Sequence, residues 1–287
     1  MEERIRVEDL THIYMPGTPF EKVSVKDISV SIRNGEFLGI VGHTGSGKST
    51  LIQHFNGLLK PDSGHVFVDG EDIFAEKGLL IKVRFKVGMV FQYAEHQLFE
   101  ETVYDDIAYG PKNAGVTGVE LERRIKQAAE AVEISEELLS KSPFELSGGQ
   151  KRRVAIAGVL AMNPEVLVLD EPAAGLDPKA KERILMMLKK LNCELGMTIV
   201  IVSHSMEDIA KYADRMIILS RGTVKYQGIP KEIFQNRRAL EEIGLSVPQA
   251  ASVMQKLYDE GMAVDRTACT VDEAVQSISE FLNKGKL

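Results

Sequence analysis

The sequence predicts an α/β fold with a mostly parallel sheet, and three observations lead to this prediction. Continuous apolar runs of strand length recur along the chain, beginning with residues 37–41. Segments with helical periodicity separate these runs, and the first helix is expected from about Lys48 to Leu59. A glycine-rich turn joins the first run directly to that helix. Buried strands that alternate with helices are typical of a parallel sheet with both faces covered.

The other elements follow from local patterns. Residues 5–7 and 28–32 alternate apolar and polar side chains, as half-buried antiparallel strands do, so we expect an antiparallel β subdomain beside the parallel sheet. The first third of the chain is predicted to contain strands and a single helix. Residues from about 93 to 162 form a predicted helical subdomain, and Asp177-Pro178 is a good start for a later helix. Further strands are expected at residues 66–69, 87–91, 166–169, 198–202 and 216–219.

The C-terminal extension, residues 245–287, differs in character from residues 1–244. Thr270 and Glu273 have the spacing of a capping box, in which each side chain accepts a hydrogen bond from the other residue's backbone. Apolar residues follow at helical spacing, namely Val271, Val275, Ile278 and Leu282. We therefore predict a main domain over residues 1–244 and a small helical appendage after it.

Bulk properties exclude some classes of protein. The formal net charge of -7 is the opposite of the basic surface that nucleic-acid backbones require, so we expect no nucleic-acid partner. Cys193 and Cys269 lack the spacing of metal ligands. No stretch approaches the ~18 uncharged apolar residues that a membrane-spanning helix needs. A role at a membrane would therefore require docking onto a protein already there.

The glycine-rich turn has the pattern G-x-x-x-x-G-K-[ST] between a buried strand and a helix. We call it the phosphate loop, and its residues are Gly42-His43-Thr44-Gly45-Ser46-Gly47-Lys48-Ser49. Glycines let backbone N–H groups surround a phosphate where a Cβ would obstruct, and the helix N-terminus adds partial positive charge. We expect Lys48 to reach the β- and γ-phosphates, Ser49 to bind Mg²⁺ and Thr50 to donate to the α-phosphate. The pattern predicts nucleotide binding but does not by itself distinguish kinases, GTPases and motors.

Two carboxylates, Asp170 and Glu171, follow the buried run at residues 166–169. Adjacent residues at a strand end point to opposite sides, so we expect the two to have different roles. Asp170 suits a position near Mg²⁺, which keeps several waters and accepts few protein ligands. Glu171 is then expected to orient and deprotonate an attacking water. Strands often end in solvated acids, and it is the phosphate loop that favours the functional interpretation.

A second anion site is predicted at the signature segment, Leu146-Ser147-Gly148-Gly149-Gln150, which opens a helix. A hydroxyl and unobstructed N–H groups at a helix N-terminus attract anions. Two such sites for one nucleotide would be redundant. We therefore expect the second to serve a nucleotide held by another chain.

With these motifs, the sequence resembles the ABC ATPase family over about residues 4–235. The motifs occur in the family's order: the phosphate loop, Gln92 at a strand end, the signature segment, Asp170-Glu171, Gly175-Leu176-Asp177 and His204. The resemblance implies a P-loop NTPase core that hydrolyses ATP with Mg²⁺. It also implies that Gln92 contacts Mg²⁺ and the water and senses a membrane partner, and that His204 contacts the γ-phosphate. Asp177 would lie across a dimer interface.

The expected site residues fall into three groups. The catalytic residues are Glu171, His204 and Gln92. The metal ligands are Ser49, Gln92 and Asp170. The residues that bind ATP are Tyr14, Gly42, Gly45, Ser46, Gly47, Lys48, Ser49, Thr50, Ser147, Gly148, Gly149, Gln150 and Asp177. Tyr14 is expected to stack on the adenine, because it follows the first strand; Phe20 is the competing candidate, and a surface tyrosine packed beside Pro16 is the structural alternative.

Two segments resemble the ATPase subunits of energy-coupling factor transporters, which import vitamins and transition-metal ions. Residues 14–21 resemble the second of the two ATPase types, and residues 91–111 also fit, with departures from the pattern at Ala94 and Ala173. The resemblance implies a head-to-tail homo- or heterodimer with a second ABC ATPase subunit. It also implies an integral membrane coupling protein and a substrate-binding membrane subunit, at the cytoplasmic face of the cell membrane. For the C-terminal extension it suggests dimerisation, against a self-contained cap.

Three alternatives remain open at this point. A soluble ABC protein of DNA repair or translation is disfavoured by the acidic charge, the single cassette and the gap of about 100 residues between Ser49 and Leu146, which is too short for a long coiled coil. A weak ATPase that binds ATP as structural glue is disfavoured by the intact Gln92, Glu171 and His204. The sequence leaves open an ATPase of another ABC importer type. The transported substrate is not encoded here, because membrane partners select it.

Overall fold

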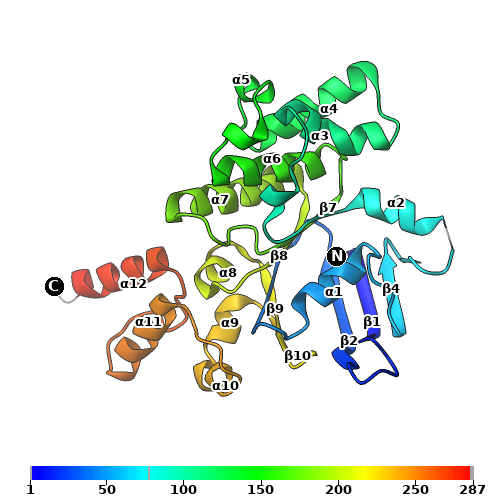
Figure 1. The fold of residues 1–287 in the computed structure, drawn as a ribbon. Helices are drawn as coiled ribbons and strands as arrows, with labels where there is room; N and C mark the ends of the chain where they lie inside the picture. Colours follow the sequence, from blue (N-terminus) through cyan, green and yellow to red (C-terminus); the bar gives the residue numbers. More distant parts are fainter. Residues whose placement is uncertain (1, 77, 285–287) are drawn as a thin grey trace.

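The larger of two sheets lies at the centre of the computed structural model, which describes residues 2–76 and 78–284 (Figure 1). Its strand order is β10-β9-β3-β8-β7-β6. The bounds are β3 (Phe37–Gly42), β6 (Val87–Val90), β7 (Val166–Asp170), β8 (Thr198–Val202), β9 (Arg215–Ser220) and β10 (Thr223–Gly228). All neighbours pair in parallel except β9 and β10. The predicted α/β class with a mostly parallel sheet is confirmed.

The second sheet is antiparallel throughout, as the alternating N-terminal segments predict. Its order is β2-β1-β4-β5. The bounds are β1 (Glu3–Tyr14), β2 (Lys22–Arg33), β4 (Ser63–Val68) and β5 (Glu71–Asp72). The pairing of β1 with β2 and β4 is what brings the end of β1 and the start of β2 near the phosphate loop.

Helix α1 (Lys48–Phe55) packs in the core that the two sheets share. Successive residues of a strand point to opposite faces, so the parallel strands supply side chains to two cores. Leu38 and Ile40 of β3 join the core with α1, whereas Phe37 and Val41 join the core on the other face. The phosphate loop is therefore held between a buried strand and a buried helix.

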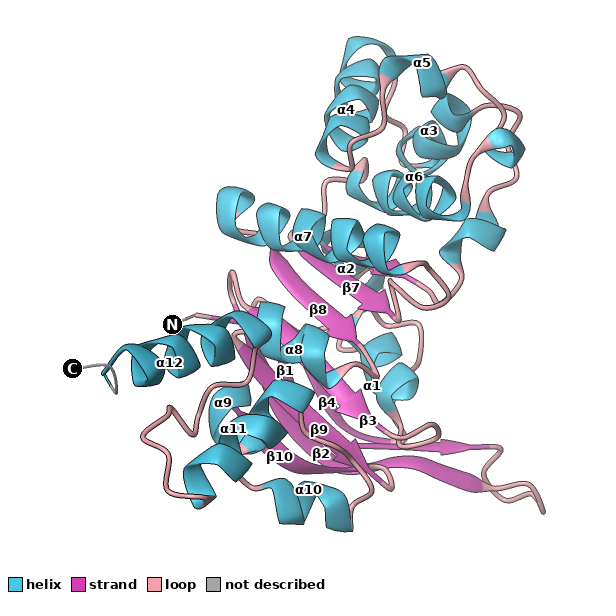
Figure 2. Cartoon of the chain, turned by 90° about the vertical axis from the view of Figure 1, so that its left-hand side faces the viewer, coloured by secondary structure: helices cyan, strands magenta, loops and turns pink. Residues whose placement is uncertain are grey.

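The helical region stands at one end of the larger sheet (Figures 1 and 2). It contains η1 (Ala94–Gln97), α3 (Val103–Asn113), α4 (Gly118–Ala131), α5 (Glu136–Leu139), η2 (Pro143–Glu145) and α6 (Gly148–Leu160). Helices α7 (Pro178–Leu195) and α8 (Met206–Tyr212) contribute to the core on the face of the sheet away from α1. As predicted, Asp177 caps α7, where its carboxylate accepts from the backbone N–H groups of Lys179 and Ala180.

Some local predictions were wrong in extent. Helix α1 ends at Phe55 rather than near Leu59, because Gly57 follows in the left-handed region with φ 67°. A second early helix, α2 (Leu79–Lys86), was missed, since Val83 is its one buried residue and no apolar stripe marks it. No sequence pattern predicted β5, β10, α9 (Pro230–Phe234) or α10 (Arg237–Glu242).

The C-terminal extension contains α11 (Gln249–Asp259) and α12 (Val271–Lys284), and its residues 285–287 lie outside the described residues. The capping box is present: Thr270 N–H donates to the Glu273 carboxylate at 3.2 Å and Glu273 N–H donates to the Thr270 hydroxyl at 3.3 Å. Val247 and Ala251 are buried in the main core. The extension is thus packed on the rest of the chain, and the domain boundary at residue 244 stays a prediction.

Within the part of the chain described, no helix is both long enough and apolar enough to cross a membrane.

Candidate nucleotide-binding site

The phosphate loop follows β3 and opens α1, in a backbone conformation that requires glycine. Gly42, Gly45 and Gly47 have φ angles of 152°, 78° and 102°, which side chains disfavour. A Cβ at Gly42 would lie 2.3 Å from the carbonyl oxygen of Leu219, and one at Gly47 would lie 2.8 Å from that of Ser24. The loop therefore exposes backbone N–H groups in a concave turn, which suits an anion.

Lys48 folds back over this loop. Its side chain is buried, and Nζ donates to the carbonyl oxygens of Gly42 at 2.7 Å and His43 at 2.9 Å. Burial lowers the pKa of Lys48, and the carboxylates of Glu171 and Asp170 partly oppose this shift. A cation is thus held next to two acids at the position where the motif predicts phosphates.

Residues from separate parts of the chain line an open cavity of about 330 Å³ above the loop. The lining residues are Tyr14, Lys22, Ser24, Thr44, Gly45, Gly47, Lys48, Ser49, Thr50, Gln92, Asp170, Glu171 and His204. The fold therefore gathers the predicted Tyr14, Gln92, Asp170, Glu171 and His204 around the loop. Sequence reasoning missed Lys22 and Ser24, which no motif marks; Ser24 Oγ lies 2.8 Å from the Thr50 hydroxyl.

The two adjacent carboxylates do not point to opposite sides, and that expectation was wrong. Strand β7 ends at Asp170, and Glu171 adopts a left-handed conformation with φ 50°, so strand alternation does not apply. Both side chains line the same cavity. Burial, and then the Asp170 carboxylate, raise the pKa of Glu171 to about 7.

His204 lies beside Glu171, with Nε2 3.1 Å from Oε1 of that carboxyl. Burial, followed by the Lys48 cation, lowers the pKa of His204 below its ordinary value. The imidazole is therefore neutral near pH 7. A neutral ring beside a carboxyl of raised pKa is a pair suited to holding and moving a proton.

The expected metal ligands Ser49, Gln92 and Asp170 come together in this cavity. They offer a hydroxyl, an amide and a carboxylate oxygen. Among residues 2–76 and 78–284, no group of three histidine, cysteine or acidic side chains is placed to hold a metal ion. An oxygen set with one carboxylate matches Mg²⁺, which keeps much of its water.

The signature segment lies elsewhere. Ser147 caps α6: its hydroxyl accepts from the backbone N–H of Gln150, while its own N–H donates to the Gln150 side chain at 2.9 Å. Ser147 and Gly148 are exposed, and neither they nor Asp177 are among the residues that line the cavity. The fold therefore does not bring these residues to this cavity, and their contribution to ATP binding stays a prediction.

Tyr14 stands at the rim of the cavity. Its side chain is 39% exposed, and its hydroxyl lies 3.2 Å from that of Thr50. Phe20, the competing candidate, is 78% exposed and is not among the residues that line the cavity. The geometry favours Tyr14 as the base-stacking residue.

His43 links the phosphate loop to Ile243 and Gly244, the last residues before the C-terminal extension. Its Nε2–H donates to the carbonyl oxygen of Ile243 at 2.7 Å, across 200 residues of sequence. Gly244 packs against the ring, where a Cβ would lie 2.9 Å from Nε2. The motif treats this position as variable, so sequence reasoning gave it no role.

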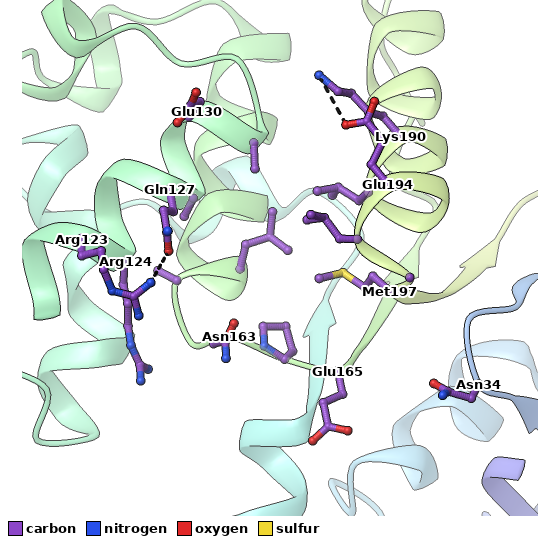
Figure 3. Close-up of a pocket in the computed structure, with 18 of the residues that line it drawn as sticks. Asn34, Arg123, Arg124, Gln127, Glu130, Asn163, Glu165, Lys190, Glu194 and Met197 are labelled. Atoms are coloured by element: carbon purple, nitrogen blue, oxygen red, sulfur yellow. Dashed lines mark hydrogen bonds and ion pairs between the residues drawn. The ribbon is translucent and has the colours of Figure 1, made fainter. Parts of the chain in front are cut away.

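A larger cleft, of about 820 Å³, lies between α4, α6 and α7 and away from the phosphate loop (Figure 3). Some of its polar side chains interact with one another. Lys190 pairs with Glu194 on α7, and Arg123 donates to Gln127 on α4. None of the predicted site residues lines this cleft.

The fold and this site define an ATP-binding cassette, the ATPase class of ABC transporters. A family model described as ABC transporter matches residues 25–174. The chain is 52% identical over 282 residues to the energy-coupling factor transporter ATP-binding protein EcfA2 of Caldanaerobacter subterraneus subsp. tengcongensis, and the match covers 98% of this chain and 99% of the relative. The chain therefore belongs to the EcfA2 family of energy-coupling factor transporter ATPases.

Solved structures agree with this assignment. The structure of cbiO1 from Clostridium perfringens, part of the ABC transporter complex cbiONQ, has a TM-score of 0.76 and 39% identity, covering 89% of this chain and 100% of that one. The ATP-binding cassette MJ0796, a dimer in a post-hydrolysis state bound to ADP and Pi, has a TM-score of 0.70 and 33% identity, and the match covers 79% of this chain and 98% of that one. The predicted ABC ATPase and its energy-coupling factor subgroup are confirmed.

Proposed function

We propose that this ATPase hydrolyses ATP in the cavity above the phosphate loop and so powers the uptake of vitamins or transition-metal ions through membrane subunits. One observation carries the proposal: a single cavity joins the phosphate loop and Lys48 to Glu171, whose pKa is raised to about 7. A carboxyl with a pKa near the working pH is an efficient general base.

The residues that line the cavity have different roles in ATP hydrolysis. The loop N–H groups and Lys48 bind the phosphates and balance their charge. Glu171 accepts a proton from water as the water oxygen bonds to the γ-phosphorus, and the bond to the leaving ADP oxygen breaks. Neutral His204 donates to the γ-phosphate and orients Glu171. Ser49, Gln92 and Asp170 would hold Mg²⁺, which supplies further charge neutralisation on the phosphates.

Membrane subunits are proposed as partners because cbiO1 is part of the cbiONQ complex and the EcfA2 relatives are subunits of transporters. The chain also presents a suitable surface beside Gln92. Tyr93, Phe99 and Tyr109 are exposed aromatic residues there, and the rings of Phe99 and Tyr109 meet edge to face at 4.9 Å. Exposed aromatic clusters of this kind mark protein interfaces.

The proposed function is tested by purifying the tagged chain from membranes of its native host. We expect a complex with integral membrane proteins and a second ATPase subunit, and ATP hydrolysis by that complex in vesicles. A chain that hydrolyses ATP but never associates with membrane proteins would contradict the transport role.

The signature segment is proposed to complete the nucleotide site of a second cassette, in a head-to-tail dimer. Ser147→Arg would place bulk and charge where the partner's γ-phosphate lies. We expect it to abolish hydrolysis at the partner's site while ATP still binds at Lys48, as measured by photolabelling each subunit with an azido-ATP.

A matched control for that experiment is Ser142→Arg, because Ser142 also begins a short helix, η2, only a few residues earlier. It should leave the labelling of both subunits unchanged. Loss of ATP from the mutated chain itself, with the partner's site intact, would rule out the head-to-tail arrangement.

Tyr14→Ala is expected to raise the KM for ATP and weaken the preference for adenine over other bases. Stacking of a base on an aromatic ring contributes about 1–3 kcal/mol, or roughly 5- to 150-fold in affinity. Tyr14→Phe, which keeps the ring and loses the contact with Thr50, should retain the preference, and so should Phe20→Ala. Steady-state kinetics with ATP and GTP measure this, and an unchanged preference in Tyr14→Ala would leave Tyr14 a structural residue.

The C-terminal extension is proposed to hold the two ATPase subunits together when nucleotide is absent. Helix α12 leaves three apolar side chains exposed, at 70% for Val271, 59% for Val275 and 55% for Leu282, whereas Ile278 packs on α11. Replacing all three with serine removes about 1 kcal/mol of burial each, so the nucleotide-free dimer should weaken by roughly 100-fold.

Substitution is a cleaner test of the extension than deletion, because the Gln255 side chain donates to the carbonyl of Phe234 in the main core. Analytical ultracentrifugation without nucleotide measures the dimer. Val119→Ser on α4, an equally exposed position, is the control and should not change it. An undiminished dimer in the triple variant would make the extension a self-contained cap.

A further inference from the structure

Arg152 is a fully buried charge at the base of the helical region. Its side chain is 0% exposed, and it lies on α6, the helix that the signature segment opens. Burying a guanidinium is costly unless its N–H groups are paired. The groups that pair with the Arg152 guanidinium therefore indicate its role.

The Arg152 guanidinium bonds to two segments of the candidate active site. On one side, Nη2 donates to Oε1 of Glu95 at 2.8 Å and Nε lies 2.5 Å from Oε2, so the guanidinium and the carboxylate form a close ion pair. Glu95 is on η1, three residues after Gln92. Burial favours a raised pKa for Glu95, but the hydrogen bond from Arg152, a backbone hydrogen bond and the nearby positive charge together hold this pKa below its ordinary value, so the carboxylate is charged.

On the other side, Arg152 donates to three backbone carbonyls of the turn that begins at Glu171. Nη1 donates to Glu171 O at 3.2 Å and to Pro172 O at 3.1 Å, and Nη2 donates to Ala174 O at 3.3 Å. One side chain thus ties together the signature helix, the Gln92 segment and the turn that carries Glu171. The left-handed conformation of Glu171, with φ 50°, is held by this turn.

Arg152 lies where α6 meets η1 and the Glu171 turn. At the C-terminal end of α6, the cleft of about 820 Å³ separates α4 from the C-terminal end of α7 (Figure 3). Helix α6 contacts β6, η1 and α7, and Arg152 is the residue through which it bonds to the Glu171 turn. A shift of α6 relative to the Glu171 turn would therefore change the Arg152 contacts.

We propose that Arg152 is a positioning residue for hydrolysis, which holds the Glu171 turn and the Gln92 segment in register with the signature helix. Through this contact, the placement of α6 against a partner's nucleotide sets the orientation of Glu171 in the chain's own site. The inference rests on the proposed function, in which Glu171 is the base and the signature segment acts on the partner.

The test compares Arg152→Lys, Glu95→Gln and their combination in the assembled complex. Arg152→Lys keeps the charge but loses the planar guanidinium with its several N–H donors, and Glu95→Gln keeps the shape but loses the charge. We expect kcat to fall between about tenfold and about 100-fold in each, since a misplaced catalytic group is costly, while ATP affinity changes by less than about twofold. The double variant should be no slower than the slower single variant, because both break one contact.

Arg153→Lys is the matched control. Arg153 is the next residue on α6 and is also buried, yet none of the contacts described for Glu95 or the Glu171 turn involves it. Its kcat should match the wild type. Thermal melting reports whether each variant folds.

The outcomes separate this inference from the proposed function. If Glu171→Gln is inactive but Arg152→Lys and Glu95→Gln keep wild-type kcat, Arg152 has no positioning role and the proposed function stands. The inference is also overturned if the kcat losses of the two single variants multiply in the double variant, because the two residues would then act independently. It is overturned too if the affinity for ATP falls together with kcat. Should Arg152→Lys fail to fold, Glu95→Gln decides alone, and a wild-type kcat there overturns the proposal.

Discussion

Glu171→Gln is expected to abolish ATP turnover and to leave ATP binding intact. The amide preserves the shape of the carboxyl and a hydrogen bond to water, but it cannot accept the proton. Loss of a general base typically lowers the rate by about 10²–10⁴-fold. The variant should therefore accumulate as an ATP-bound closed dimer, measured as ATPase rate and as dimer mass in the presence of ATP.

The pH dependence gives a second readout of the same residue. The pKa of Glu171 is about 7 because of burial and the neighbouring Asp170, and a base must be deprotonated to act. Wild-type turnover should rise with pH through about 7, and Glu171→Gln should lose this rise. Glu165→Gln, at the opposite end of β7, is the control and should behave as the wild type. Near-normal hydrolysis in Glu171→Gln would show that another group is the base.

Lys48→Ala is expected to weaken ATP binding severely. The substitution removes a cation that the fold holds against the loop carbonyls of Gly42 and His43. Hydrogen bonds to charged groups contribute about 1.5–3 kcal/mol, so affinity should fall roughly 10- to 150-fold, with hydrolysis lost at cellular ATP. Equilibrium binding of a fluorescent ATP analogue measures the change.

Lys60→Ala is the control for Lys48, since Lys60 is an exposed lysine just beyond α1 and is not among the residues that line the cavity. It should bind ATP as the wild type does. Because Lys48→Ala leaves two loop carbonyls without a donor, its thermal unfolding is measured in parallel. Normal ATP affinity in a folded Lys48→Ala protein would overturn the assignment of the phosphate loop.

The parts of the site that the sequence predicts well are those determined by short segments. The phosphate loop needs glycine at positions where the backbone turns with positive φ, so its pattern is visible within a few residues. Asp177 at the start of α7 and Thr270 at the start of α12 are likewise local caps. Continuous apolar runs predict β7 and β8 because both faces of these strands are covered.

The parts that the sequence does not predict depend on contacts between distant segments. Glu171 enters the same cavity as Asp170 because β7 stops one residue before it, and no pattern marks that stop. Ser24 reaches Thr50 because β2 pairs with β1 beside the loop. In the sequence, Arg152 is one of several basic residues on a predicted helix. The role proposed for it depends on the Glu95 carboxylate and the backbone carbonyls that the fold brings to it.

The hydrogen bond from His43 to Ile243 decides where the chain can be shortened or fused to another protein. Ile243 supplies the acceptor, and Gly244 covers the imidazole ring. A version that stops before Ile243 leaves His43, a residue of the phosphate loop, without its hydrogen-bond acceptor. Such a cut is therefore expected to change the affinity for ATP. A version that stops after Gly244 keeps both groups in place. Shortened proteins and fluorescent or affinity fusions that are meant to preserve the nucleotide site should therefore keep Ile243 and Gly244, and those that are also meant to preserve the main core should keep Val247, Ala251 and Gln255.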